Sequence, residues 1–343
     1  MDESTAVFPF TRIVKQEKMK LALLLNAVDP SIGGALIRGN KGTAKSTAVR
    51  SMAQFLPTRS AVKGCVYHCD PRHPRRMCAD CRARFEAGEE LPVEQVPMRV
   101  IELPLNATED RVAGTLDLEH VLETGKRKFE PGILASANGN ILYVDEINLL
   151  DDHIIDLLLD SAAMGRNYVE REGISFSHPA AFILVGTMNP EEGDLRPQLL
   201  DRFGLSVMVE NEEMLDQRVQ VLKERLAFDA DPEGYLESCR DELAELRAKV
   251  AAARELLPRI VVDDSILEMA TRLSFNFKME GHRCDLALIR SARANAALNG
   301  RTEITRDDMI LVAPMVLTHR VKKHAFDQKE LTEGEIRTCL LKM

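Results

Sequence analysis

Eight consecutive residues combine glycines, a lysine and hydroxyl side chains in the pattern of a phosphate-binding loop. They are Gly39, Asn40, Lys41, Gly42, Thr43, Ala44, Lys45 and Ser46. In such a loop, backbone N–H groups and a helix N-terminus surround phosphate oxygens, a lysine ammonium reaches the outer phosphates, and a hydroxyl binds Mg²⁺. Lys45 and Ser46 are placed for the last two roles, and Thr47 extends the candidate nucleotide contacts.

Ala44 departs from the usual pattern, which has glycine immediately before the lysine. An alanine fits there if its φ is negative and the phosphate clears its Cβ, so we expect a negative φ at Ala44. Gly39 and Gly42 then provide the backbone freedom of the loop. Taken alone, the stretch has an alternative interpretation as a strand-to-helix turn without a ligand.

Two acidic residues follow the apolar run from Ile141 to Val144 and resemble a Walker B element. A parallel strand delivers the residues at its carboxyl end to the sheet edge where ligands bind. Asp145 is placed to complete a Mg²⁺ shell with Ser46, and Glu146 to polarise the attacking water. The alternative for the pair alone is the start of a solvated loop.

Two polar residues further along the chain are candidates for contact with a γ-phosphate. Asn189 ends the apolar run 181–188 and is placed to orient the attacking water; its alternative role is to cap the turn before Pro190. Arg202 has the planar, permanently charged fork that suits phosphate, and it could reach the nucleotide of a neighbouring subunit. The alternative for Arg202 is a salt bridge with Asp201 or Glu210.

Four of the seven cysteines are crowded into 17 residues, with gaps of three, eight and two residues between them. Thiolates arranged as a tetrahedron are the ligands that Zn²⁺ prefers, so the spacing predicts a zinc site, with iron–sulfur ligation less favoured. His68 and His73 are spare ligands. The alternative is a set of reduced surface cysteines in a flexible insertion. The quartet is Cys65, Cys69, Cys78 and Cys81.

These residues require an α/β core that brings strand ends together. Apolar runs predict strands, and residues spaced three and four apart predict helices. A hairpin is expected to turn near Glu172 and Gly173. The expected strands are 35–37, 98–103, 141–144 and 181–189, the hairpin covers 167–176, and the expected helices include 19–25, 46–52 and 152–164.

The chain is expected to be helical from Asp216 onwards. Apolar residues spaced three and four apart from Leu236 to Leu257 predict one helix with Cys239 in its core, ended by Pro258. Three more helices are expected at 266–277, 281–300 and 305–319, and no element is predicted for the last ~20 residues. The expected domains are an α/β domain at 1–210, a helical linker at 211–258 and an all-α domain at 259–343.

The composition limits the class of protein. With 343 residues and a formal charge of −9, the chain can bury a large core and is not a generally basic nucleic-acid binder. Seven cysteines in this length do not make a disulfide scaffold. No stretch approaches the ~20 apolar residues of a membrane span, so we expect a cytoplasmic protein.

Together the motifs resemble the AAA+ ATPases, and within them the I subunits of magnesium chelatase. The likeness extends from about Phe8 to His319. It is carried by the phosphate loop, the two acids and three further runs. These runs are NLLDDH at 148–153, VEREGI at 169–174 and NPEEGDLRPQLLDRFG at 189–204.

The resemblance implies a parallel-sheet core with a helix-2 insertion at 115–131, a pre-sensor-1 hairpin insertion at 167–177 and a C-terminal all-α domain. It implies a hexameric ring with Mg²⁺-ATP bound between subunits. One protomer would contribute the phosphate loop, Asp145, Glu146 and sensor-1 Asn189, and the next would contribute Arg202 as an arginine finger. Arg283, or alternatively Arg290, matches the sensor-2 arginine. Ile13 and Val14 are added as candidate nucleotide contacts.

The resemblance also implies partners: a D-type subunit with an integrin-like domain and an H-type subunit that binds the porphyrin and inserts the metal. This chain would hydrolyse ATP without binding the tetrapyrrole. Many chelatase I subunits have no cysteine quartet at this place, which is a departure. The alternatives are a MoxR-like chaperone for another integrin-domain partner, a nucleic-acid motor of the helicase or clamp-loader type, and a nucleotide-binding scaffold.

Overall fold

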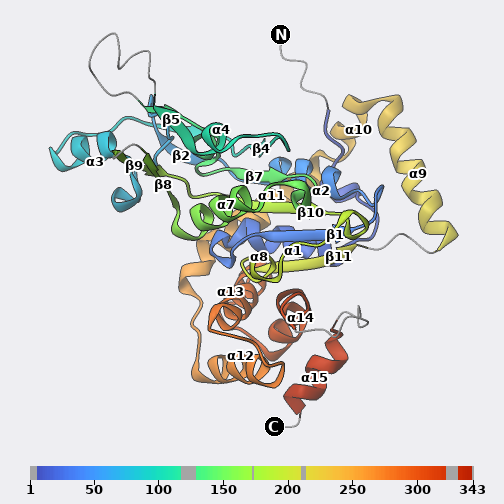
Figure 1. Cartoon of the computed structure of the whole chain (residues 1–343). Coiled ribbons are helices and arrows are strands. Elements are labelled where there is room, and N and C mark those ends of the chain that lie inside the picture. Colours follow the sequence, from blue (N-terminus) through green and yellow to red (C-terminus); the bar gives the residue numbers. More distant parts are fainter. Residues whose placement is uncertain (1–5, 117–128, 172–173, 210–213, 322–330, 342–343) are drawn as a thin grey trace. The chain divides into compact units, whose positions relative to one another are not determined.

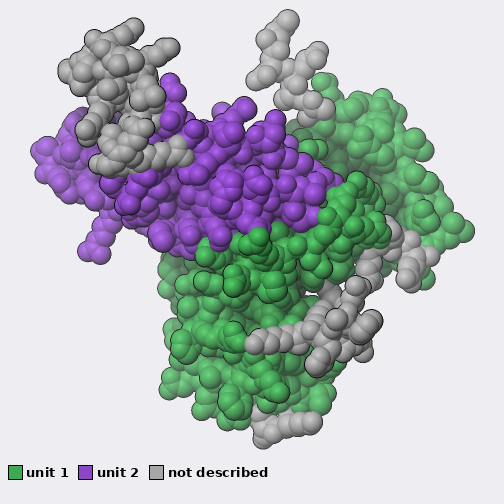
Figure 2. Space-filling model, viewed as in Figure 1, with its two compact units in different colours: residues 1–57, 187–343 green, residues 58–186 purple. Residues whose placement is uncertain are grey.

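The computed structural model describes residues 6–116, 129–171, 174–209, 214–321 and 331–341 (Figure 1). The chain divides into two compact units (Figure 2). Unit 1 comprises residues 1–57 and 187–343, and unit 2 comprises residues 58–186. Within the described residues, no helix is both long enough and apolar enough to cross a membrane.

Five strands form the predicted parallel sheet, in the order β11-β1-β10-β7-β4. Nearly every residue of β1, β7 and β10 is buried, as expected for parallel strands covered on both faces. The four predicted strands are confirmed, and β11 is an additional one. The strands are β1 Ala35–Gly39, β4 Val100–Glu102, β7 Ile141–Val144, β10 Ile183–Met188 and β11 Leu205–Val209.

The described residues of unit 2 form three antiparallel strand pairs in addition to strands of the sheet. The predicted hairpin is confirmed as β8 Arg166–Arg171 paired with β9 Ile174–Pro179, and its expected turn at residues 172–173 lies outside the described residues. A second pair, β2 Arg59–Val62 with β3 Val93–Val96, flanks the cysteine segment and its helix α3 Ala79–Glu86.

The remaining elements of unit 2 lie before, within and after the predicted helix-2 insertion along the chain. Residues 117–128, the interior of that insertion, lie outside the described residues. The flanking strands β5 and β6 pair antiparallel. The predicted helix at 152–164 is confirmed as α7. The elements are α4 Glu109–Ala113, β5 Gly114–Leu116, β6 Phe129–Pro131, α6 Ile133–Ala137 and α7 Asp152–Met164.

The expected helix through Leu236 and Leu257 is interrupted, so that prediction was wrong in its continuity. Cys239, with φ −100° and ψ 0°, separates α10 from α11. The bend accompanies full burial of Cys239, whose Sγ accepts a hydrogen bond from Arg12 Nε at 3.3 Å. The helices preceding the C-terminal group are α1 Glu17–Val28, α2 Lys45–Ser51, α8 Pro197–Leu200, α9 Leu215–Ala230, α10 Pro232–Ser238 and α11 Arg240–Leu256.

The C-terminal helices confirm three predictions and add one element. α13 packs against α1, α11, α12 and α14, which buries most of its length. α15 was not predicted, because its sequence is mostly polar and too few apolar residues recur in it to show a helical period. Its fully buried residues are Ile336 and Leu340. These helices are α12 Asp264–Asn276, α13 Arg283–Leu298, α14 Arg306–Leu317 and α15 Glu333–Leu341.

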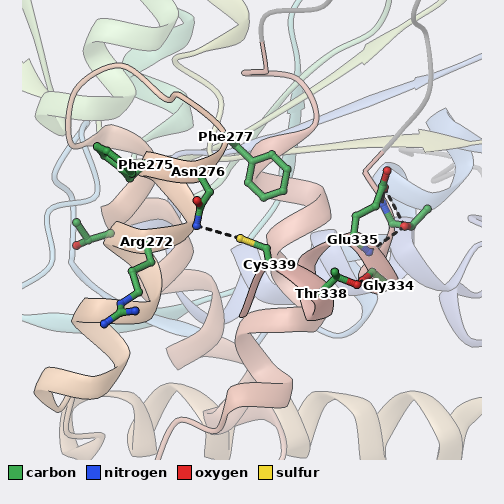
Figure 3. Close-up of a pocket in the computed structure, with 10 residues that line it drawn as sticks. Arg272, Phe275, Asn276, Phe277, Gly334, Glu335, Thr338 and Cys339 are labelled. Atoms are coloured by element: carbon green, nitrogen blue, oxygen red, sulfur yellow. Dashed lines mark hydrogen bonds between the residues drawn. The ribbon is translucent and has the colours of Figure 1, made fainter. Parts of the chain in front are cut away.

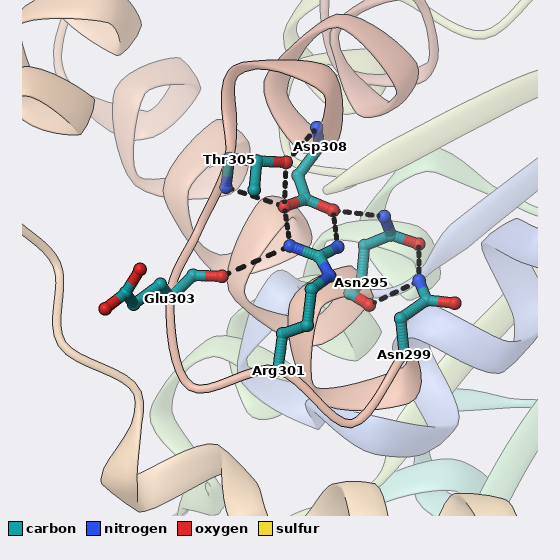
Figure 4. A network of polar contacts seen from close by, with 6 residues as sticks. All are labelled: Asn295, Asn299, Arg301, Glu303, Thr305 and Asp308. Carbon is teal, nitrogen blue, oxygen red and sulfur yellow. Dashed lines mark hydrogen bonds and ion pairs between the residues drawn. The ribbon is translucent and has the colours of Figure 1, made fainter.

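A buried carboxylate fixes the connection between α13 and α14 (Figure 4). Asp308 is 2 % exposed and accepts hydrogen bonds from Arg301, Asn295 Nδ2 at 2.6 Å and the Thr305 backbone N–H at 2.7 Å. Thr305 Oγ1 accepts from the Asp308 N–H, which completes a capping box at the start of α14. Burial opposes the charge, but the hydrogen bonds from Arg301 and Thr305 outweigh it and lower the pKa of Asp308.

Replacing Asp308 tests this connection. Asp308→Asn should lower the free energy of unfolding by roughly 2–4 kcal/mol at pH 7, because Arg301 loses its ionised partner. A carboxyl whose pKa is lower in the folded protein stabilises above its unfolded pKa of about 3.9 and ceases to do so as the pH falls through its folded pKa. The difference from the wild type should therefore shrink below about pH 4 in urea unfolding curves.

Asp307→Asn is the matched control, because the Asp307 side chain is 81 % exposed. Its effect should stay within about 0.5 kcal/mol. Equal losses in the two variants would contradict the assigned role of Asp308.

Candidate functional site

The predicted phosphate loop lies between β1 and α2, which is the strand–loop–helix context that the motif requires. Gly39 has φ +157°, and a Cβ at this position would lie 2.3 Å from the Val209 carbonyl oxygen on β11. Gly42 has φ +83°. The two glycines therefore provide freedom that other residues lack, as the sequence predicted.

Ala44 does not have the predicted negative φ. It is left-handed, with φ +58° and ψ 19°, and α2 begins at the next residue. A left-handed alanine costs about 1–2 kcal/mol, so this conformation is held by the surrounding loop. The prediction failed because it placed all the left-handed freedom on the glycines, whereas the turn into α2 needs it at Ala44 too.

Lys45 folds back over its own loop. Its ammonium donates hydrogen bonds to the carbonyl oxygens of Gly39 at 2.5 Å and Asn40 at 2.7 Å. The Thr43 hydroxyl donates to the same Asn40 oxygen at 2.9 Å. Lys45 and the next two residues, Ser46 and Thr47, are half-buried in the first turn of α2. The structure therefore brings the predicted cation and hydroxyl to one helix start, where phosphate oxygens are stabilised.

A salt bridge links the phosphate loop to the segment after β10. Lys41 Nζ lies 2.5 Å from Glu192 Oε1, in the 3₁₀ helix η6 Pro190–Glu192. Asn189 precedes this helix, is 3 % exposed, and accepts the Glu191 N–H through Oδ1 at 3.2 Å. The capping role of Asn189 is thus present, and its contact with nucleotide stays a prediction.

The segment that carries Arg202 is held by two other arginines. Asp201 accepts from Arg283 at 2.7 Å and from Arg320 Nε at 3.2 Å. Arg320 also donates to the backbone oxygens of Asp201, Phe203 and Gly204. Arg320 was missed by the sequence reasoning, which stopped at His319. The available signal was an arginine three residues after the end of the apolar helix α14. The sensor-2 role of Arg283 stays a prediction.

Arg290 and Arg293, on the same face of α13, reach a different part of unit 1. Arg290 donates to the Ser31 carbonyl oxygen at 2.5 Å, and Arg293 pairs with Asp29 at 3.0 Å. Asp29 is buried at the end of α1. These two arginines therefore attach the helical domain to the turn that leads into β1.

The two predicted acids follow β7 in unit 2. The strand is fully buried, and Asp145 and Glu146 are half-buried at its end. Glu146 is left-handed, with φ +50° and ψ +52°, and it precedes the 3₁₀ helix η5 Ile147–Leu149. A strained non-glycine residue is often found where a side chain has to be aimed for function.

Of the two added nucleotide contacts, one is accessible. Ile13 is buried, and its carbonyl oxygen accepts from Lys20 Nζ at 3.2 Å. Val14 lines an open pocket with Met214 and Leu215 of the α9 segment. Val14 thus lines a pocket and Ile13 lies in the core, and nucleotide contact by either residue stays a prediction.

A second pocket lies between α12 and α15 and is lined by Arg272, Phe275, Asn276 and Cys339 among others (Figure 3). Asn276 donates a hydrogen bond to Cys339 Sγ across it at 3.2 Å. None of the predicted phosphate-binding residues lines this pocket. It therefore does not match the predicted nucleotide site.

The four cysteines predicted as metal ligands come together. Their Sγ atoms all lie within 4.8 Å of one another, and those of Cys65 and Cys78 are 3.9 Å apart. Zn–S bonds of about 2.3 Å in a tetrahedron place neighbouring sulfurs about 3.8 Å apart. A single tetrahedral ion therefore fits the quartet, whereas an iron–sulfur cluster needs room for several atoms between its thiolates.

The environment of the sulfurs favours the thiolate at Cys65, whereas hydrogen bonding to Cys65 raises the pKa of Cys69 and burial raises that of Cys81. The Cys78 N–H donates to Cys69 Sγ at 3.2 Å, and the Cys81 N–H donates to Cys78 Sγ at 3.5 Å. Hydrogen bonds from the thiols of Cys69 and Cys78 lower the pKa of Cys65. The spare ligand His73 instead lies 3.2 Å from Asp70. The candidate donor set among the described residues is therefore the four sulfurs.

Comparison with known proteins gives two family matches and close relatives. An AAA domain of the dynein-related subfamily matches residues 90–203, and an AAA lid domain matches residues 267–339. A magnesium-chelatase subunit ChlI homolog of Methanocaldococcus jannaschii is 49% identical and aligns with 97% of this chain and 91% of its own length. The magnesium-chelatase 38 kDa subunit of Acidiphilium rubrum is 50% identical over 94% of this chain and 93% of its own.

The chain belongs to the magnesium-chelatase I-subunit family. A solved structure, a cryo-EM-based model of the complex between magnesium-chelatase subunits BchI and BchD, is 47% identical to it, covers 93% of this chain and 98% of its own, and has a TM-score of 0.54. This chain is an AAA-type ATPase, and its AAA match contains Asp145, Glu146, Asn189 and Arg202. The lid match contains Arg283, Arg290 and Arg320.

Glu146 is the residue to change first. Glu146→Gln should leave Mg²⁺-ATP binding within about twofold of the wild type and lower kcat by at least about 100-fold, because the amide cannot accept a proton from the attacking water. Nucleotide binding is measured by calorimetry and turnover by phosphate release. Wild-type turnover in the variant would remove this residue from the catalytic assignment.

Proposed function

We propose that this chain is the ATP-hydrolysing motor subunit of a magnesium or related metal chelatase, in which partner subunits insert the metal ion into a tetrapyrrole. One observation carries the proposal: a phosphate loop with a strained left-handed residue before its lysine, in a chain about half identical to magnesium-chelatase subunits. The loop supports the proposed binding of ATP. The similarity to magnesium-chelatase subunits supports metal insertion as the process that ATP hydrolysis drives.

In the proposed mechanism, a bound Mg²⁺ would supply positive charge to offset that of the phosphate oxygens. Ser46 and Asp145 would hold this ion, and Lys45 would leave its loop carbonyls to neutralise the outer phosphates. Glu146 would orient water for in-line attack on the γ-phosphate, and Asn189 would fix the position of that water.

We propose that the site is completed by a second copy of the chain in a hexameric ring. Arg202 would act as the arginine finger on the neighbour's nucleotide, because its fork matches the charge that develops on the transferred phosphate. The contacts of Arg320 with the backbone on both sides of Arg202 support a fixed finger segment. Arg283, by its pair with Asp201, would transmit the position of the helical domain to the same segment.

The proposed partners are a D-type subunit and an H-type subunit that holds the porphyrin. The BchI–BchD complex among the solved relatives supports the first. The same relatives favour a chelatase over the chaperone and nucleic-acid motor alternatives. A reducing compartment such as the cytoplasm is proposed because all seven cysteines are free thiols.

We also propose that Cys65, Cys69, Cys78 and Cys81 bind one structural Zn²⁺. The 3.9 Å separation of the Cys65 and Cys78 sulfurs and the N–H donors to the Cys69 and Cys78 sulfurs support this assignment.

The trans role of Arg202 predicts complementation. Arg202→Ala and Lys45→Ala should each lack ATPase activity, and an equimolar mixture should recover up to about a quarter of wild-type turnover, because a quarter of the interfaces pair both intact residues. Phosphate release after subunit exchange measures the recovery. A mixture of Lys45→Ala with Glu146→Gln is the control and should stay inactive, since both residues act within one protomer. No recovery in the first mixture would contradict the trans role.

The zinc assignment predicts the metal content. The wild type, purified without chelator, should carry about one zinc per chain by plasma mass spectrometry, and Cys78→Ser should carry less than about a fifth of that. Cys339→Ser, which changes a cysteine on α15 outside the quartet, should keep the wild-type content. A wild type without bound metal would refute the assignment.

A further inference from the structure

The cysteine segment of unit 2 has too small a core to order itself. Its buried apolar residues besides the cysteines are Val62, Met77 and Leu91, with Tyr67 packed at the edge. Segments of this size are usually held by a metal or by disulfides, because their apolar area does not offset the entropy of ordering the chain. An ion bound by its sulfurs would therefore add to the order of this segment and of what it contacts within unit 2.

The first contact is with the β8–β9 hairpin through two stacked rings. Tyr67, between the ligands Cys65 and Cys69, stacks on His178 of β9 with ring centroids 5.1 Å apart and an interplanar angle of 19°. His178 is fully buried, and burial lowers its pKa, so the ring is neutral at pH 7. Its Nδ1–H donates to the Pro179 oxygen at 2.9 Å, and Nε2 accepts from Asn167 of β8 at 3.0 Å. The stack therefore rests on a ring fixed by both strands.

The second contact joins the other half of the quartet to the same hairpin. Arg166, the first residue of β8, donates to the Met77 carbonyl oxygen at 3.2 Å and to Ser177 Oγ of β9 at 3.1 Å. Met77 immediately precedes the ligand Cys78. The loop with Cys65 and Cys69 therefore contacts the hairpin through Tyr67. The segment before Cys78 and Cys81 contacts it through the Met77 carbonyl oxygen.

The third contact reaches the loops that enter β7 and β10. Asn138 Nδ2 donates to the Tyr67 oxygen at 2.7 Å, and Asn138 Oδ1 accepts from the Ala181 N–H at 3.0 Å. Arg59 donates to the oxygens of His68 at 3.1 Å and Asn138 at 3.0 Å. The ligand loop 65–69 is thus attached to the starts of two core strands as well as to the hairpin.

We propose that Zn²⁺ bound by the quartet is a brace for the β8–β9 hairpin. The ion fixes the spacing between the Tyr67 loop and the Met77 turn, and these two points hold β9 and β8 through His178 and Arg166. The inference rests on the zinc site proposed above. According to this proposal, the hairpin is ordered when zinc is bound and less ordered when it is not. The hairpin carries Tyr168, which is 54 % exposed.

Hydrogen–deuterium exchange on the full-length protein tests the brace, with zinc measured in the same samples. Removing zinc with a chelator should speed amide exchange in peptides from 166–179 by at least about tenfold and leave α13 peptides unchanged. Tyr67→Leu and Arg166→Met should keep the zinc and still speed exchange in the hairpin, because they remove the two contacts and not the ligands.

Tyr168→Leu is the matched control for Tyr67→Leu, and it should change hairpin exchange by less than about twofold because the side chain is exposed. Unchanged hairpin exchange after confirmed zinc removal would overturn the brace and leave the zinc site standing. A wild type without zinc would overturn both. The chelator experiment uses the wild-type protein, so its outcome does not depend on whether the variants fold.

Discussion

The backbone path from Gly39 to Ala44 is the constraint on which the rest of the site depends. Three residues in this stretch have positive φ, and a side chain at Gly39 would collide with the Val209 carbonyl oxygen at 2.3 Å. The left-handed conformation of Ala44 in this path is unfavourable by about 1–2 kcal/mol. Because of this path, α2 begins at Lys45. The Lys45 ammonium, the Ser46 hydroxyl and the first N–H groups of the helix therefore belong to the same turn.

Charged side chains connect this loop, and the segment that carries Arg202, to other parts of unit 1. Lys41 attaches it to η6, which follows Asn189, through a 2.5 Å salt bridge. Asp201 is held by Arg283 and Arg320, both from the part of the chain that matches an AAA lid. The part of the chain that matches an AAA lid is thus joined to the residues on both sides of Arg202 by hydrogen bonds.

The elements that the sequence predicted well are those with strong local patterns. Buried strands such as β7 and β10 appear as apolar runs, and α14, capped by Thr305, lies within the helix expected at 305–319. The meeting of the four cysteines followed from their spacing alone.

What sequence reasoning missed depends on distant contacts. The break at Cys239 accompanies a hydrogen bond from Arg12, 227 residues away, and Arg320 acts on a segment that precedes it by 116–119 residues. The left-handed φ of Ala44 is imposed by its loop against the intrinsic preference of alanine. Neither the break at Cys239 nor the φ of Ala44 is indicated by the local pattern of residue types, and the partners of Arg320 are not indicated by it either.

Calorimetric titration of the purified wild type with ATP in the presence of Mg²⁺ tests the central claim most directly. The account predicts saturable binding with a dissociation constant below about 1 mM, weakened at least about tenfold in Lys45→Ala. Absence of binding to the wild type, or equal affinity in Lys45→Ala, would contradict it.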